Sequence, residues 1–338
     1  MHEAMLYRPW PKMPGFLECT LCAHYCKIAP GRLGVCAVRS NQDGKMYTLV
    51  YGKAIANHID PIEKKPLFHF LPGTNILSIA TAGCNFKCHF CQNWQISQLS
   101  KEWHGEMPGE DLPPAEIVRQ ANQAGCRAIA YTYTEPTIFF EYAYDTARLA
   151  QEQGLRNVFV TNGYQSVEAL EAMVGVIDAA NVDLKSFSDQ TYKRICGARL
   201  QPVLDTIRRM WEKGIWVEVT TLVVPGQNDS AQELAAIGQF LASVSPDLPW
   251  HISRFHPDYK MADVPPTPVW TLHRAAEIGQ AAGLKYVYVG NVWGDAYEHT
   301  YCPNCGQIGI YRIGYRVRNR LQGGSCPTCH TPIPGCWN

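Results

Sequence analysis

Residues 76–91 read ILSIATAGCNFKCHFC, an apolar run followed at once by three closely spaced cysteines. The run at 76–80 is short and apolar, which predicts a strand buried on both faces of a sheet. Cys84, Cys88 and Cys91 follow with the spacing C-x3-C-x2-C, which is tight enough for one loop to wrap a single metal group. The stretch therefore predicts a buried strand followed by a loop that holds three thiols close together.

Similar apolar runs recur along the chain and alternate with stretches of helical pattern. The runs lie at 128–133, 157–161, 180–184, 216–224, 251–255 and 286–289, and the helical stretches at 114–124, 138–153, 166–174, 204–213, 231–242 and 269–282. Repeated strand–helix units imply a parallel sheet with right-handed crossovers. We therefore predict an α/β fold, with a partial (β/α) barrel of parallel strands over residues 75–297.

Polar residues follow several of the predicted strands, where the chemistry of such barrels is found. Glu135 follows the run at 128–133, Asn162 follows the run at 157–161, and Asp183 and Lys185 close the run at 180–184. We expect these side chains to meet the three thiols at one end of the barrel. For Glu135 the alternative role is an acid at the N-terminus of the helix that begins near Ile138. For Asn162, Asp183 and Lys185 it is a strand-end cap or a turn.

The remaining cysteines form two further groups outside the predicted barrel. In residues 1–74, Cys19, Cys22, Cys26 and Cys36 offer four thiolates for a structural zinc, with an auxiliary iron–sulfur cluster as the alternative. In residues 298–338, Cys302, Cys305, Cys326 and Cys329 form two C-x2-C knuckles, the pattern of a zinc ribbon. Rubredoxin-like iron and disulfides are the alternatives there. We thus predict a metal-binding region and a zinc-ribbon-like domain on either side of the barrel.

The composition narrows the classes of function. Thirty basic residues balance thirty acidic ones, so the net charge of zero provides no general attraction to nucleic acid or to an anionic membrane. No apolar stretch approaches the roughly 20 residues that span a bilayer. We therefore expect a cytoplasmic protein, in which clustered cysteines bind metal more often than they form disulfides.

Three thiolates around a cubane of four irons leave one iron open to an outside ligand. The spacing of Cys84, Cys88 and Cys91, with the aromatic Phe90 before the third cysteine, resembles the defining motif of the radical SAM superfamily. That resemblance implies a 4Fe-4S cluster whose open iron binds S-adenosylmethionine, and a reductive cleavage to a 5′-deoxyadenosyl radical. A three-cysteine zinc site completed by His89 is the alternative.

The barrel region is similar to the branch that contains pyruvate formate-lyase activating enzyme. This similarity implies that Glu135 meets the methionyl amine and that Asn162, Asp183 and Lys185 contact the ribose and the carboxylate. The two glycines that precede the glutamate in that branch are missing here.

The whole layout, including the charged block at 60–67, resembles the AmmeMemoRadiSam-system radical SAM enzymes. This resemblance implies partners of the Memo and AMMECR types, and a reductant such as flavodoxin or ferredoxin. We expect a radical enzyme that acts on a protein, as glycyl-radical activases do. Modification of a small molecule or an RNA base is one alternative, and a non-catalytic zinc-binding interaction module is another.

Overall fold

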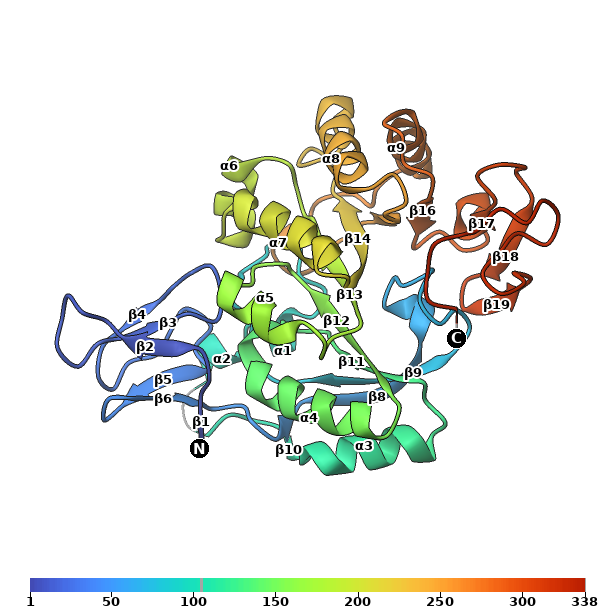
Figure 1. Cartoon of the computed structure of the whole chain (residues 1–338). Coiled ribbons are helices and arrows are strands. Elements are labelled where there is room, and N and C mark those ends of the chain that lie inside the picture. Colours follow the sequence, from blue (N-terminus) through green and yellow to red (C-terminus); the bar gives the residue numbers. More distant parts are fainter. Residues whose placement is uncertain (104–105, 338) are drawn as a thin grey trace.

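The computed structural model describes residues 1–103 and 106–337, and its centre is one large sheet (Figure 1). The strand order is β16-β15-β14-β13-β12-β11-β9-β8, and all neighbours from β9 to β16 run parallel. The parallel strands are β9 (Asn75–Ala80), β11 (Ala128–Tyr131), β12 (Arg156–Thr161), β13 (Ala179–Asp183), β14 (Trp216–Val223), β15 (Trp250–Arg254) and β16 (Val287–Gly290). The predicted α/β class and partial barrel are confirmed, and each predicted strand is found within two residues of its expected ends.

Helices surround the outer face of this sheet (Figure 1). They are α3 (Pro114–Gln123), α4 (Phe140–Glu152), α5 (Val167–Met173), α7 (Leu200–Glu212), α8 (Ala231–Val244) and α9 (Val269–Ala281). In α7, Val203, Ile207 and Met210 recur at helical spacing and are fully buried. This apolar stripe fixes the helix against the sheet and leaves the strand ends free to build a site.

Strand β8 (Ala56–Pro61) lies at the edge of the sheet and pairs antiparallel with β9. Its polar residues Asn57, His58 and Asp60 interrupt any apolar run, and the sequence pattern did not predict it. Through β8 the first part of the chain is built into the central sheet. The domain limits at residues 74 and 298 stay a prediction.

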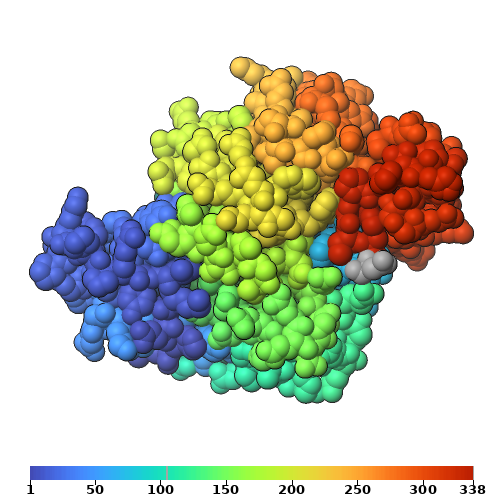
Figure 2. Space-filling model, in the orientation of Figure 1, coloured from blue at the N-terminus to red at the C-terminus, as the bar shows by residue number. Residues whose placement is uncertain are grey.

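The N-terminal region forms two small sheets beside the barrel, with the orders β1-β6-β5 and β2-β3-β4. Their strands are β1 (His2–Glu3), β2 (Tyr7–Pro9), β3 (Leu17–Cys19), β4 (Lys27–Ile28), β5 (Arg39–Gln42) and β6 (Lys45–Thr48). Strand β7 (Lys53–Ala54) pairs with β10 (Glu110–Asp111). In Figure 2 this blue region and the red C-terminal region lie on opposite sides of the barrel.

The C-terminal region is a three-stranded antiparallel sheet of β17 (Thr300–Tyr301), β18 (Ile308–Ile313) and β19 (Arg316–Asn319). Arg312 on β18 is fully buried at the junction with the barrel. Its Nη2 donates to the carbonyl of Phe68 at 2.7 Å, and its guanidinium lies 4.2 Å from the centre of the Phe68 ring. The C-terminal region is therefore packed onto the barrel through buried contacts.

A buried polar network lies near the amino ends of β14 and β15. Glu218 accepts hydrogen bonds from the backbone N–H groups of Phe68 and His69, at 2.9 and 2.8 Å, and lies 2.6 Å from Nε2 of His251. His69 contacts the carbonyl of Pro334 through Nδ1 at 2.7 Å. The segment that carries Phe68 and His69 thus connects the amino end of the barrel to the C-terminal region.

Of the helices in the described ranges, none has the length and apolar character needed to cross a membrane.

Candidate active site

The loop after β9 brings the three central cysteines to the carboxyl ends of the parallel strands. Gly83 begins the loop with a φ of +107°, and a Cβ there would lie 2.8 Å from Oγ of Ser100, so the position requires glycine. Cys88 is buried, whereas Cys84 and Cys91 are half-buried. The predicted strand and loop therefore place all three thiols on one side of a single cavity.

This cavity has a volume of about 440 Å³, within the usual size range of small-molecule sites. Every barrel residue that the sequence analysis selected lines it. These residues are Cys84, Cys88, Phe90, Cys91, Glu135, Asn162, Asp183 and Lys185. They come from the ends of four strands that are separated in sequence, so the fold brings together what the sequence showed only as separate motifs.

The three loop thiols differ in arrangement from the four C-terminal cysteines. Thiolates on one tetrahedral zinc ion stand about 3.8 Å apart, because each Zn–S bond is about 2.3 Å. Within residues 1–103 and 106–337, the ligand atoms of three or more residues all lie within 4.8 Å of one another at one place, the C-terminal cysteines. Among the described residues, the thiols of Cys84, Cys88 and Cys91 do not form such a close group, and three soft thiolates on one loop are the type of donor that an iron–sulfur cluster takes.

Glu135 occupies the centre of the strand ends and is 1% exposed. Its carboxylate accepts from the N–H and the hydroxyl of Thr137, from the hydroxyl of Thr161 and from the N–H of Asn162, at 2.5 to 3.0 Å. Burial raises the pKa of this carboxyl, and the four donated hydrogen bonds oppose that shift. The residue thus joins the ends of β11 and β12 and also faces the cavity, while its contact with a methionyl amine stays a prediction.

Asn162 links the end of β12 to the cysteine loop. Its Nδ2 donates to Oδ1 of Asn85 at 2.7 Å and lies 3.9 Å from Sγ of Cys84. A second N–H group near the same sulfur belongs to Phe86, whose backbone N lies 3.3 Å from it. Hydrogen bonds to cluster sulfurs are one of the means by which a protein sets a reduction potential.

Asp183 and Lys185 form an ion pair in the wall of the cavity, with Nζ 2.9 Å from Oδ2. Burial disfavours the charged ammonium, but Asp183 together with the neighbouring Cys88 and Cys196 outweighs this effect, and the pKa of Lys185 is raised. The same Nζ lies 5.9 Å from the centre of the Phe90 ring. The pair therefore presents both signs of charge to the cavity, next to the aromatic residue of the cysteine motif.

A family model described as the radical SAM superfamily matches residues 78–237. These residues include the cysteine loop and the strands on both sides of it. The chain belongs to the radical SAM superfamily. Among its relatives, an uncharacterized protein of Methanocaldococcus jannaschii is 47% identical over 319 residues, which cover 94% of this chain and 93% of that protein.

This radical SAM protein is also similar to a characterised enzyme and to a solved structure. The pyruvate formate-lyase 1-activating enzyme of Escherichia coli K12 is 23% identical over 222 residues, which cover 61% of this chain and 89% of that enzyme. A radical SAM methyltransferase from Sphaerobacter thermophilus shares the fold with a TM-score of 0.52, at 17% identity, over 71% of each chain. Superfamily membership implies a 4Fe-4S cluster and S-adenosylmethionine as cofactors, and the three loop thiolates are the type of donor that such a cluster takes.

The structure adds to the site a charged group whose role the sequence left undefined. Lys64 and Lys65 line the cavity, and Nζ of Lys65 lies 2.7 Å from Oδ2 of Asp60. Tyr133 donates a hydrogen bond to the same carboxylate, and Nζ of Lys65 lies 4.2 Å from the centre of its ring. Burial lowers the pKa of Lys65 to about 8. The charged block at 60–67 indicated charge near the barrel entrance. The ion pair between Lys65 and Asp60 inside the site depends on β8, which carries Asp60.

Cys196 is a second feature that the sequence did not assign to the site. It is 1% exposed, ends the turn η3 (Tyr192–Cys196), and its side chain lies within hydrogen-bonding reach of Cys88. The turn supports the cysteine loop through the carbonyl of Cys196, which accepts from the N–H of Lys87 at 2.9 Å. A fourth thiol therefore lies behind the three-cysteine motif.

The C-terminal cysteines have the geometry of a single-ion site. Sγ of Cys302 lies 3.5 Å from Sγ of Cys329, and Sγ of Cys305 lies 3.6 Å from Sγ of Cys326. All four thiols fall within 4.8 Å of one another, close to the separation expected on one tetrahedral ion. These four residues could hold a metal ion, as the ribbon pattern predicted.

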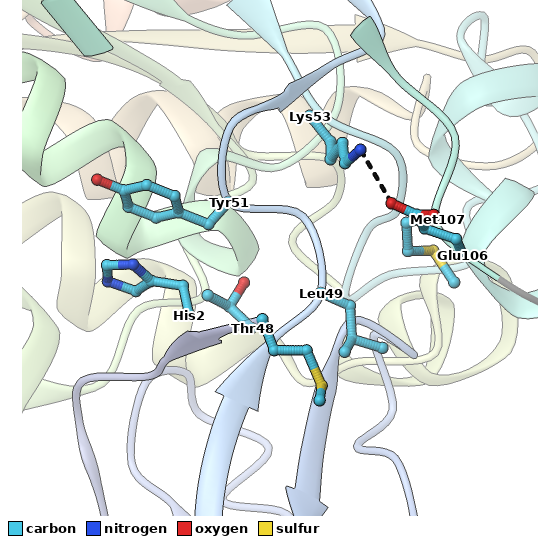
Figure 3. Close-up of a pocket in the computed structure, with 8 residues that line it drawn as sticks. His2, Thr48, Leu49, Tyr51, Lys53, Glu106 and Met107 are labelled. Atoms are coloured by element: carbon cyan, nitrogen blue, oxygen red, sulfur yellow. Dashed lines mark ion pairs between the residues drawn. The ribbon is translucent and has the colours of Figure 1, made fainter. Parts of the chain in front are cut away.

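Two further cavities lie near the N-terminal region. One is small and is lined by Cys19, Cys22, Cys26 and Cys36. The other, drawn in Figure 3, is lined by His2, Tyr51 and Lys53 among others, and Lys53 forms an ion pair with Glu106 across it at 3.0 Å. The second cavity shares no lining residue with the site at the cysteine loop.

Proposed function

We propose that this protein cleaves S-adenosylmethionine reductively at a 4Fe-4S cluster held by Cys84, Cys88 and Cys91. When bound, such a cluster supplies the electron that splits the sulfonium into methionine and a 5′-deoxyadenosyl radical. The observation that carries the proposal is the single cavity lined by these thiols together with Glu135 and the pair of Asp183 and Lys185. Superfamily membership supports it.

The side chains of the cavity would position the cosubstrate around the open iron. The ammonium of Lys185 suits the methionyl carboxylate, and Asp183 and Asn162 suit ribose hydroxyls. Glu135 would orient this wall by holding the ends of β11 and β12, and its carboxylate is available to the methionyl ammonium. Phe90 would cover the cluster and limit the access of water to the radical.

We propose a protein as the substrate, with removal of a hydrogen atom from its backbone or a side chain. The similarity to the pyruvate formate-lyase activating enzyme supports this choice. A small molecule is the second candidate, and one observation favours it. A cavity of about 330 Å³, lined by Phe68, His251 and Trp293, shares Lys64, Thr220, Ser253, Asn291 and Tyr315 with the main cavity, and so offers enclosed space beside it.

Several finer assignments belong to the same proposal. A flavodoxin or ferredoxin would supply the electron, zinc would occupy the C-terminal site, and the protein would work in the cytoplasm, where thiols stay reduced. Partners of the Memo and AMMECR types rest on the sequence resemblance alone. Co-purification of a tagged chain with each candidate partner tests them.

The proposal is tested by the formation of 5′-deoxyadenosine after anaerobic reconstitution with iron and sulfide and reduction with dithionite. We expect wild type and Cys126→Ala to form it, because Cys126 lies outside the site. Cys88→Ala should form none while it keeps the helical circular dichroism of wild type. Turnover retained in Cys88→Ala would refute the assignment of the cluster.

A further inference from the structure

Two cavities of the barrel meet at a shared boundary. The cavity at the cysteine loop has a volume of about 440 Å³, and the cavity beside it, which contains Phe68, His251 and Trp293 in its wall, has a volume of about 330 Å³. We call the second one the side cavity. The residues that line both cavities, and so form the boundary between them, are Lys64, Thr220, Ser253, Asn291 and Tyr315. A molecule that moves from one cavity to the other must pass these residues.

Tyr315 differs from the rest of the boundary because it belongs to the C-terminal region. Thr220 and Ser253 lie on β14 and β15, Asn291 follows β16, and Lys64 precedes the barrel. Among the described residues from 298 to 337, Tyr315 alone lines the cavity at the cysteine loop. It is 53% exposed, so one part of it faces solvent and another part faces the cavities. The C-terminal region therefore reaches the site through one side chain.

A two-residue turn carries Tyr315 to the boundary. Ile313 on β18 pairs with Arg316 on β19, so Gly314 and Tyr315 form the whole turn. Gly314 has a φ of +55°, and glycine is favoured at the first position of such a turn. A Cβ at Gly314 would lie 2.4 Å from a ring carbon of Trp293, so the turn packs directly against that ring. Both the backbone and the packing at position 314 therefore require glycine.

Glu298 fixes the turn to the end of the barrel. It is 8% exposed and lines the side cavity. Its Oε2 accepts from the N–H of Gly314 at 3.1 Å and from the N–H of Gly294 at 3.2 Å. Gly294 lies in the loop after β16, directly after Trp293. One carboxylate oxygen therefore holds the turn and the loop together, and Tyr315 has a defined position although half of it is exposed.

We propose that Tyr315 separates the side cavity from the cysteine loop and so determines which molecules reach the radical, and that Glu298 positions it. A 5′-deoxyadenosyl radical takes hydrogen from a C–H group that reaches it, so the site must keep other molecules away. A tyrosine ring at the boundary blocks the route from the side cavity, whereas an alanine would leave it open. The inference rests on the proposed function, because it concerns access to the radical that this function generates.

The test measures how easily a small alcohol reaches the radical. The reconstituted protein cleaves S-adenosylmethionine with dithionite and methyl viologen in the presence of perdeuterated 2-propanol, and mass spectrometry measures the deuterium in the 5′-deoxyadenosine. The radical breaks the C–D bond at the central carbon of the alcohol and forms a C–D bond in 5′-deoxyadenosine. The alcohol radical that remains gives one electron to oxidised methyl viologen and its hydroxyl proton to water, and so becomes acetone. The alcohol concentration is kept where the label in the wild-type product rises linearly.

We expect Tyr315→Ala to raise the labelled fraction by at least about threefold, because the boundary is then open. Tyr301→Ala is the matched control and should match the wild type, since Tyr301 is 38% exposed in the same region and lines neither cavity. A labelled fraction in Tyr315→Ala equal to that of the wild type would overturn the inference alone. Absence of 5′-deoxyadenosine from the wild type would refute the proposed function and, with it, this inference.

The positioning role of Glu298 has a readout that needs no cofactor. Hydrogen exchange at the N–H of Gly314, measured before reconstitution with iron, should be faster in Glu298→Ala than in the wild type. Glu298→Gln keeps an oxygen acceptor and should restore both slow exchange and the wild-type labelled fraction. Equal exchange in Glu298→Ala and the wild type would overturn this role. Should Glu298→Ala not fold, as judged by circular dichroism, Tyr315→Ala decides alone, because its substitution lies in a half-exposed turn.

Discussion

Glu135 shows how one residue can meet two expectations that the sequence presented as alternatives. Its carboxylate caps the N-terminus of the helical turn Pro136–Phe139 by accepting from the N–H of Thr137, and its place in the wall of the cavity keeps it within the site. A single sequence does not separate these roles, because both require a carboxylate directly after a strand. The sequence thus predicted which residue belongs to the site. The four hydrogen bonds that its carboxylate accepts could be seen only in the structure.

At the same scale, the side chain of Cys196 lies within hydrogen-bonding reach of Cys88, so a role of Cys196 as a ligand can be tested. If three thiols hold the cluster, Cys196 has only a packing role. Cys196→Ala should then cost about 1 kcal/mol of stability, because one small buried group is lost. Its iron content and its rate of 5′-deoxyadenosine formation should stay within about twofold of wild type. Loss of both iron and turnover, as in Cys88→Ala, would show that Cys196 ligates the fourth iron.

The strands that follow the cysteine loop could be predicted at the scale of elements because their apolar runs are continuous. Strand β8 could not, because half of its side chains are polar and it is recognisable only through its pairing with β9. The same limit hid the role of Lys65, whose partner Asp60 lies on β8 and whose other neighbour, Tyr133, is distant in sequence. Contacts between elements far apart in the chain leave no local pattern to detect.

The four thiols that could hold a metal ion join the loops on both sides of the C-terminal strands, so we expect the site to stabilise these strands. Cys305→Ala should lose about one zinc ion per chain and lower the free energy of unfolding by more than about 4 kcal/mol, because structural zinc contributes folding free energy directly. Metal analysis and chemical unfolding measure the two effects. Cys126→Ala serves as the control and should keep the zinc. Unchanged stability in Cys305→Ala would contradict a structural role for the site.

At the scale of the whole molecule, the two ends of the barrel have different roles, one in forming the site and one in holding the C-terminal region. The carboxyl ends of the strands carry the cavity with the cysteine loop, and the amino ends carry the buried network of Glu218, His69 and Arg312 that holds the C-terminal region in place. Parallel strands predict the first arrangement from sequence. The second rests on contacts between residues 149 to 265 positions apart, which leave no local pattern in the sequence.

His69 makes the junction at the amino end sensitive to acid. Burial lowers the pKa of His69 to about 4, below the usual value near 6.5. Between these values the unfolded chain binds a proton that the folded chain does not, so stability falls as the pH drops from 6.5 to 4, by up to about 3 kcal/mol. Urea unfolding across this range measures the slope. His69→Asn should show a smaller slope, and equal slopes would contradict the assignment.

The central claim is that three thiols leave one iron open to S-adenosylmethionine. The most direct measurement is the electron paramagnetic resonance spectrum of the reduced, reconstituted protein, recorded with and without S-adenosylmethionine. We predict that S-adenosylmethionine shifts the g-values of the reduced cluster, because its amine and carboxylate bind an iron directly. Superimposable spectra with and without S-adenosylmethionine would contradict the account.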